Sequence, residues 1–198
     1  LEQSLDGIAR ISKIVSAMKE FSHPGQGEKQ TIDLNSAIES TIIISTNEWK
    51  SVAEMKTSFD PTLPLVPCVV GEFNQVILNL VVNSAHAIGD VKEKQPGGKG
   101  LITVSTKNLG HFVEIRIKDS GGGIPASIAD KIYDPFFTTK EVGKGTGQGL
   151  AIARNIIVHK HGGTIRFEST VGDGTEFIIT LPLAVAASES CESAAYAN

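Results

Sequence analysis

The chain has 198 residues, 40% of them hydrophobic and 20 of them glycine, and its formal net charge at pH 7 is -4. This length and apolar content suffice for one domain with a substantial core. The acidic balance, without any block of basic residues, argues against a nucleic-acid-binding role.

Residues 1–23 have the pattern of an amphipathic helix. Its apolar positions recur every three or four residues, at Leu1, Leu5, Ile8, Ile11, Ile14, Val15, Met18 and Phe21. Pro24 ends this helix and begins a linker over 24–28. A stripe of this length requires a partner helix, and the alternative is a helix folded back on its own domain.

The segment 29–67 predicts short elements followed by an extended connection. The expected elements are a strand near 30–33, a helix over 34–49 with Asp33 or Asn35 as its N-cap, and a strand over 53–59. Pro61, Pro64 and Pro67 then disfavour both a helix and a central strand.

The stretch from Glu72 to Ile88 predicts a helix with one narrow polar stripe. At 100° per residue the stripe is about 80° wide and comprises Glu72, Gln75, Asn79, Asn83 and His86. The remaining surface is mostly apolar, so we expect burial on most sides. Buried amides without partners cost roughly 1–3 kcal/mol each, and an Asn oxygen can bind Mg2+. The alternative is a structural amide network between the helix and the sheet.

A glycine-rich loop over 92–100 leads to a predicted hairpin. Its first strand covers 101–106, its turn lies at 108–110, and its second strand ends at Asp119. Val113, Ile115 and Ile117 alternate on one face, which places Asp119 on the same inward face. An ionised carboxylate at the edge of the core needs donors, and an adenine amino group would serve. The alternative is an Asp that caps a turn.

Two glycine clusters follow. Gly121 to Gly123 let a flat ligand approach the backbone. Four alternate glycines over 143–149 lead into a helix predicted over 150–163, whose N-terminus favours phosphate groups. The spacing fits neither a P-loop nor a Rossmann motif, and the H-R-D and D-F-G signatures of protein kinases are absent. The clusters predict a nucleotide site with a flexible lid, and the alternative is an ordinary linker.

The last predicted elements are a strand over 163–170, a turn at 172–174 and a strand over 175–182. The order of helices and hairpins predicts an α+β fold, a two-layer α/β sandwich. Its sheet is mixed and mostly antiparallel, with helices on one face. We expect this domain to cover 29–183 and the small, polar tail 184–198 to be disordered.

Four motifs resemble the N, G1, F and G2 boxes of the ATP-binding domain of bacterial sensor histidine kinases, in their usual order. They are N-L-V-V-N-S-A-H-A-I at 79–88, D-S-G-G-G-I-P at 119–125, F-F-T-T-K at 136–140 and G-T-G-Q-G-L at 145–150. The resemblance covers 29–183 and implies the Bergerat ATP-binding fold, which these kinases share with DNA gyrase, mismatch-repair ATPases and a heat-shock chaperone. It implies ATP and Mg2+ as cofactors.

The resemblance also implies roles for individual residues. Asp119 would bind adenine, Asn83 would hold Mg2+, and Asn79 and His86 would lie beside the phosphates. His86 stands where the family frequently has Lys or Arg. Lys140 and Lys144 are lid cations that could reach the phosphates, and the alternative for each is a solvated lysine. The other residues expected at the ATP site are Gly121, Gly123, Ile124, Phe137, Thr138, Thr139, Gly145, Thr146, Gly147, Gln148, Gly149, Leu150 and Thr175.

The implied activity is transfer of the γ-phosphoryl group of ATP to a histidine in a two-component system. Residues 1–23 resemble the C-terminal part of the second helix of a dimerisation hairpin, so we expect the acceptor histidine to lie upstream and none of the five histidines here to be catalytic. The expected partners are the phosphoacceptor helix of the same kinase, a response regulator or receiver domain, and a second copy in a homodimer.

Two alternatives remain, an ATP-hydrolysing clamp of the gyrase type and a non-catalytic nucleotide-sensing module. In the hydrolases a Glu orients water at the place of Asn79, whose uncharged amide cannot act as a general base. Cys68 and Cys191 have neither metal-ligand spacing nor a disulfide framework, which favours a reducing compartment. With no signal peptide and no apolar run of roughly 18–20 residues, we expect a cytoplasmic chain, whose parent protein could be anchored to the inner membrane.

Overall fold

The computed structural model describes residues 29–94, 97–140 and 145–183. The predicted helix 1–23, the linker 24–28, the tail 184–198 and Lys144 therefore lie outside the described residues.

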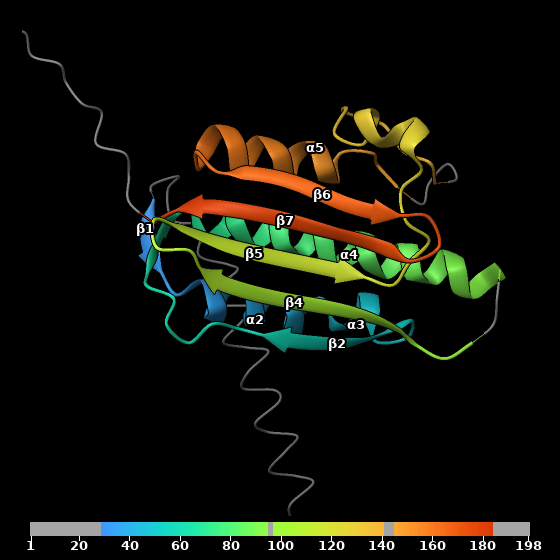
Figure 1. Cartoon of the computed structure of the whole chain (residues 1–198), viewed down its shortest axis with the longest axis horizontal. Coiled ribbons are helices and arrows are strands. Elements are labelled where there is room, and N and C mark those ends of the chain that lie inside the picture. Colours follow the sequence, from blue (N-terminus) through green and yellow to red (C-terminus); the bar gives the residue numbers. More distant parts are fainter. Residues whose placement is uncertain (1–28, 95–96, 141–144, 184–198) are drawn as a thin grey trace, which may run out of the picture.

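A five-stranded sheet forms one layer of the domain (Figure 1). Its strands run in the order β2 (Ala53–Ser58), β4 (Gly100–Asn108), β5 (Phe112–Asp119), β7 (Gly174–Pro182) and β6 (Thr164–Thr170). The neighbours β2 and β4 are parallel, whereas the other three pairs are antiparallel. The predicted mixed, mostly antiparallel sheet is confirmed.

Helices form the second layer and lie on one side of the sheet (Figure 1). They are α2 (Leu34–Ile44), α3 (Thr46–Trp49), α4 (Val70–Lys94) and α5 (Gly149–Arg154), which continues as the π-helical stretch η2 (Asn155–Lys160). The central helix α4 packs against β4, β5 and β7 and contacts α2, α3 and α5. A short 3-10 helix, η1 (Ala126–Lys131), follows β5. None of the helices in the described part of the chain is long and apolar enough to cross a membrane.

The core lies between α4 and the sheet. Phe73, Ile77 and Leu80 of α4 are fully buried, as are Ile115 and Ile117 of β5. The alternation predicted for β5 is confirmed, because its inward positions are buried and end at a buried Asp119. Helix α4 is buried on most sides mainly for the reason expected from its sequence, since apolar side chains cover most of its surface outside the polar stripe. Asn74 and Ser84 are the polar exceptions that it buries.

The helix predicted over 34–49 is broken at Ser45, which separates α2 from α3. Asp33 caps α2 as predicted, because its side chain accepts a hydrogen bond from the Ser36 N-H. At the break, the Ser45 hydroxyl donates to the carbonyl oxygens of Thr41 and Ile42, at 2.9 and 3.2 Å. Hydroxyls that donate to the preceding turn bend helices, so the continuous apolar pattern does not give one continuous helix.

Other boundaries also differ from the prediction. Helix α4 extends beyond 72–88 at both ends, and β4 extends beyond 101–106. The helix predicted over 150–163 changes from α to π geometry after Arg154, with the His161 N-H donating to the Ile156 carbonyl. An additional antiparallel ribbon joins β1 (Gln30–Ile32) to β3 (Val66–Cys68), and Pro67 is tolerated in β3 because this ribbon has only two strands among the described residues.

Candidate nucleotide-binding site

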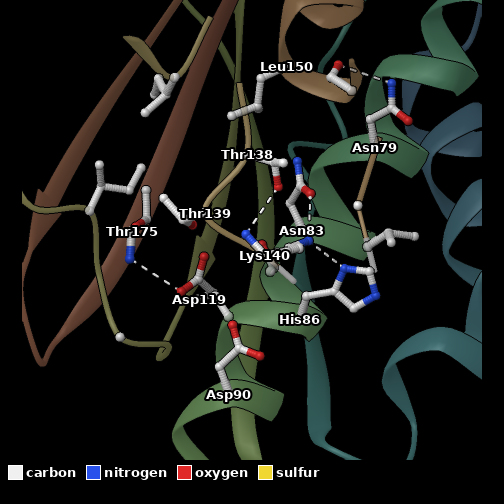
Figure 2. A pocket seen from close by; sticks show the side chains of 18 of the residues that line it. Asn79, Asn83, His86, Asp90, Asp119, Thr138, Thr139, Lys140, Leu150 and Thr175 are labelled. Atoms are coloured by element: carbon white, nitrogen blue, oxygen red, sulfur yellow. Dashed lines mark hydrogen bonds between the residues drawn. The ribbon is translucent and has the colours of Figure 1, made fainter. Parts of the chain in front are cut away.

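A cavity of about 720 Å³ opens between α4 and the segments that follow β5 (Figure 2). Its size lies within the range of roughly 300–1,000 Å³ that is typical of small-molecule sites. Most residues predicted for the ATP site line it, namely Asn79, Asn83, His86, Asp119, Gly123, Ile124, Phe137, Thr138, Thr139, Lys140, Gly145, Thr146, Gly147, Gly149, Leu150 and Thr175. Gly121 and Gln148 do not line it, and Lys144 lies outside the described residues.

Asp119 lies at the end of β5 with only 3% of its surface exposed. One of its oxygens, Oδ1, accepts backbone hydrogen bonds from Gly121 at 2.8 Å and from Thr175 at 3.3 Å. Burial raises the pKa of this carboxyl, and the two backbone N-H groups and the Ser84 hydroxyl oppose that rise. Asp119 can therefore both cap the turn and bind a ligand. Capping uses Oδ1, and Oδ2, which has no backbone donor among the described residues, can accept from a ligand.

The glycines after Asp119 allow close packing around it. A Cβ at Gly121 would lie 2.7 Å from the Ala87 Cβ and 2.9 Å from Asp119 Oδ1. Gly123 has a φ of +74°, and a Cβ there would lie 2.2 Å from the Thr170 carbonyl oxygen. Gly121 thus lets α4 approach the carboxylate instead of lining the cavity itself.

Three members of the predicted polar stripe of α4, Asn79, Asn83 and His86, line the cavity (Figure 2). The other two do not, because Glu72 pairs with Lys160 and Gln75 is exposed outside the cavity. The Asn79 amide donates to the Gly149 carbonyl oxygen at 3.1 Å, which ties α4 to the first residue of α5. Asn83 presents its Oδ1 to the Lys140 ammonium at 3.5 Å. Asn79 therefore fits the alternative of a structural amide network, since its amide joins two helices. Asn83 fits the ligand role better, because its oxygen already faces the Lys140 ammonium.

Lys140 lies over this stripe and contacts His86, with 2.6 Å between Nζ and the imidazole Nδ1. Burial lowers the pKa of His86, and the positive charge of Lys140 lowers it further. Burial also lowers the pKa of Lys140, and the charge of Asp90 opposes that change. A neutral His86 that accepts from the ammonium satisfies both groups. Among the described residues that line the cavity, Lys140 then carries the one positive charge, and its ammonium lies next to Asn83 Oδ1, an oxygen that can bind a cation.

The F and G2 segments pack backbone against backbone. Gly147 has a φ of +65°, and a Cβ there would lie 2.4 Å from the carbonyl carbon of Phe136. Phe136 itself has a φ of 67° and is 70% exposed. Since positive φ is unfavourable for a bulky residue, this contact holds the chain in a conformation that it would not adopt alone.

Twelve lining residues were not predicted from the sequence, namely Glu48, Leu78, Val82, Ser84, Ala87, Asp90, Val91, Gly122, Pro125, Ile128, Ile132 and Phe177. Ser84 is 1% exposed, and its hydroxyl lies near the Asp119 carboxylate without forming a well-directed hydrogen bond to it or to any other described residue. Asp90 continues the spacing of the stripe by four residues, a signal that was present in the sequence. Glu48 lies on α3, and no local pattern connects it to the site.

The donor set fits Mg2+ bound together with a nucleotide. No group of three His, Cys, Asp or Glu residues suited to a metal ion occurs among the described residues. Mg2+ usually keeps several waters and takes one or two protein oxygens besides substrate phosphates. Asn83 Oδ1, which already faces the Lys140 ammonium, supplies such an oxygen.

Comparison with known proteins places these features in a family. Residues 69–185 match the family model of histidine kinase-, DNA gyrase B- and HSP90-like ATPases. Sensor histidine kinase ZraS of Escherichia coli K12 is 35% identical over 175 residues, which cover 88% of this chain and 35% of ZraS. The chain thus spans about a third of the length of the curated relatives that it matches.

Solved structures agree with the sequence matches. The catalytic domain of histidine kinase ThkA superposes with a TM-score of 0.67 and 30% identity, covering 79% of this chain and 96% of that domain. ThkA in complex with response regulator protein TrrA matches with a TM-score of 0.63 and 26% identity, covering 91% of this chain and 49% of that one.

Proposed function

Because this chain belongs to the family of histidine kinase-, DNA gyrase B- and HSP90-like ATPases and its relatives are sensor histidine kinases, we propose that it is the ATP-binding catalytic domain of such a kinase. It binds Mg-ATP and transfers the γ-phosphoryl group to a histidine on a dimerisation helix. The observation that carries the proposal is the pairing, across one cavity, of a buried Asp119 on the sheet with the cation-facing stripe of α4.

The residues divide between the two ends of ATP. Asp119 accepts a hydrogen bond from the adenine amino group through Oδ2, since its Oδ1 is held by the backbone. Lys140 and Asn83 lie at the other end, where the phosphates are bound. Asn83 would hold Mg2+ through its Oδ1, and the bound ion would neutralise phosphate charge.

The transfer requires positioning more than covalent participation by this domain. An imidazole nitrogen of the acceptor histidine forms a bond to the γ-phosphorus while the bond from that phosphorus to the β,γ-bridging oxygen breaks, and ADP leaves. Lys140 stabilises the charge that accumulates on the phosphoryl oxygens. The acceptor comes from a separate helix, so the full-length kinase is proposed to act as a homodimer.

The gyrase-type alternative is disfavoured by the environment of Asn79. A hydrolase of that type needs a general base to orient water, whereas the Asn79 amide donates to the Gly149 carbonyl oxygen. The complex of ThkA with its response regulator supports a response regulator as the proposed downstream partner. A cytoplasmic location stays a prediction.

The proposal is tested with ATP labelled on its γ-phosphate. The chain alone is expected to bind ATP without labelling itself, and to place acid-labile label on a separately supplied polypeptide that carries the upstream dimerisation helix. The Asp119→Asn variant is the matched control and is expected to lose this transfer. Release of labelled phosphate without label on the helix would favour a hydrolase, and ATP binding without turnover would favour a nucleotide sensor.

A further inference from the structure

Helix α4 carries one acidic side chain into the cavity beyond the predicted stripe. The spacing of Asn79, Asn83, His86 and Asp90 is four, three and four residues, which keeps all four on one face of a helix. Asp90 lines the cavity, and Figure 2 shows it beyond His86 along α4, on the side away from Asn79. The polar stripe therefore ends in a carboxylate, one turn beyond the groups assigned to the phosphates.

The Asp90 carboxylate makes no hydrogen bond or ion pair within the part of the chain that the structure describes, and its side chain is exposed at the rim. Its charge nevertheless acts on the site, because it favours the protonated forms of both His86 and Lys140 and so opposes the lowering of their pKa. The acceptor oxygens of Asp90 are thus close to the phosphate-binding groups and available to a ligand.

A carboxylate in an ATP site needs a donor on the ligand. The phosphates are negative and repel it, and the ring nitrogens of adenine only accept hydrogen bonds. ATP offers two kinds of donor, the exocyclic amino group of adenine and the hydroxyls of the ribose. Asp119 on the sheet is placed for the amino group. The ribose joins the base to the phosphates. Asp90 lines the same cavity as Asp119, and its charge acts on His86 and on Lys140, which lies at the phosphate end.

We propose that Asp90 accepts hydrogen bonds from the ribose hydroxyls of the bound nucleotide and makes this site select ribonucleotides over deoxyribonucleotides. The proposal rests on the ATP-binding function proposed above. A carboxylate can accept from both hydroxyls of a vicinal diol, and acidic residues fill this role at the ribose of dinucleotide sites on other folds. Glu48 also lines the cavity, but its charge acts on His86 alone and less strongly than that of Asp90.

The test compares dissociation constants of ATP, 2′-deoxyATP and 3′-deoxyATP by calorimetry, each with Mg2+ present. The parent chain is expected to bind ATP roughly 10-fold more tightly than at least one of the deoxy forms, the factor that one charge-assisted hydrogen bond supplies. Asp90→Ala should reduce this ratio to about one by weakening ATP binding. Glu93→Gln, which changes an exposed acid on the same helix outside the cavity lining, is the matched control and should keep the ratio.

Failure of this inference differs from failure of the proposed function. A parent chain that binds no adenine nucleotide would refute the function. Normal ATP binding without discrimination, or discrimination that survives in Asp90→Ala, would overturn the role of Asp90 alone. If Asp90→Ala weakens all three nucleotides equally, Asp90 acts through Lys140 and not through the ribose. If Glu48→Gln removes the preference and Asp90→Ala does not, the ribose is bound by Glu48 and the assignment is wrong.

Discussion

Replacing Asp119 with Asn should separate nucleotide affinity from stability. The variant side chain has nearly the same shape, and its single oxygen can still accept from the N-H groups of Gly121 and Thr175, which now bind Oδ1. The second oxygen becomes an NH2 group. The acceptor that we propose for the adenine amino group is thereby replaced by a donor, and two donors cannot form a hydrogen bond with each other.

The size of the effect follows from the charge of the lost acceptor. A hydrogen bond to a charged group contributes about 1.5–3 kcal/mol, so the dissociation constant of ATP should rise on the order of 10- to 100-fold. Stability should change in the other direction. Burial raises the pKa of Asp119 in the folded state, so folding disfavours its ionised form near neutral pH. A neutral amide removes that cost, and the free energy of unfolding should stay equal or increase.

Calorimetry with Mg-ATP and urea denaturation at pH 7.5 measure the two quantities on the same variant. Asp173→Asn, in the exposed turn between β6 and β7, is the matched control and should change neither. An Asp119→Asn protein that folds and binds ATP as tightly as the parent would refute the adenine assignment. A strong loss of stability would instead show that the carboxylate is mainly structural.

Three further predictions concern the proposed metal ligand Asn83, the loop glycine Gly147 and the buried His161. Asn83→Ala should weaken ATP binding in the presence of Mg2+ and reduce its Mg2+ dependence, measured as the ratio of dissociation constants with and without the ion; an unchanged ratio would make Asn83 structural. Gly147→Ala should lower affinity for ATP at least several-fold, because its Cβ would lie 2.4 Å from the carbonyl carbon of Phe136 at a φ of +65°; Gly110→Ala, where φ is also positive but no atom lies within 4 Å, is the control. His161 should make the protein less stable as the pH falls below its ordinary pKa of 6.5, because burial lowers that pKa in the folded state and the unfolded chain takes up the proton first. Urea denaturation at pH 7.5 and 5.5 should show a smaller pH effect in His161→Gln, and an equal effect would exclude His161 as its source.

The sequence was sufficient for the parts of the site that depend on periodicity. The parity of Val113, Ile115 and Ile117 places Asp119 inward, and the structure buries it. The stripe on α4 is predictable for the same reason, since side chains repeat every 3.6 residues on a helix and every two on a strand. Both patterns are local, and neither requires knowledge of which elements pack together.

Other features depend on hydrogen bonds that compete with regular structure. The Ser45 and Thr46 hydroxyls both donate to carbonyl oxygens of α2, and the Trp49 indole N-H donates to Ile42. These bonds end α2 although its apolar pattern continues. His161 similarly donates from Nδ1 to the Ile156 carbonyl and accepts from the Val69 N-H at Nε2, which fixes the π-helical end of η2 against the start of α4. Hydrophobic periodicity carries no signal for either arrangement.

The cavity wall is least predictable where distant segments meet. Glu48 lies on α3, and Asp90 lies in the part of α4 beyond the predicted helix end. Asp90 could have been included by extending the stripe one more turn. Glu48 could not, because its place depends on how α3 packs on α4, a contact set by the break at Ser45.

The surroundings of Asp119 in the cavity depend on strand register as well as on motif residues. In the pairing of β5 with β7, Asp119 is opposite Thr175, and Ile117 is opposite Phe177. The Thr175 hydroxyl lies 2.9 Å from Ser169 Oγ. Ser169 Oγ in turn accepts a hydrogen bond from the Ile124 N-H at 2.7 Å. A slip of one residue would put Glu176 opposite Asp119, which would bring two like charges together, and would turn the inward side chains of β7 outward. Gly174 permits the correct register, because a Cβ there would lie 2.0 Å from the Asp119 carbonyl oxygen. The pairing that buries the apolar core therefore also brings Thr175 and the loop at Ile124 next to the Asp119 carboxylate.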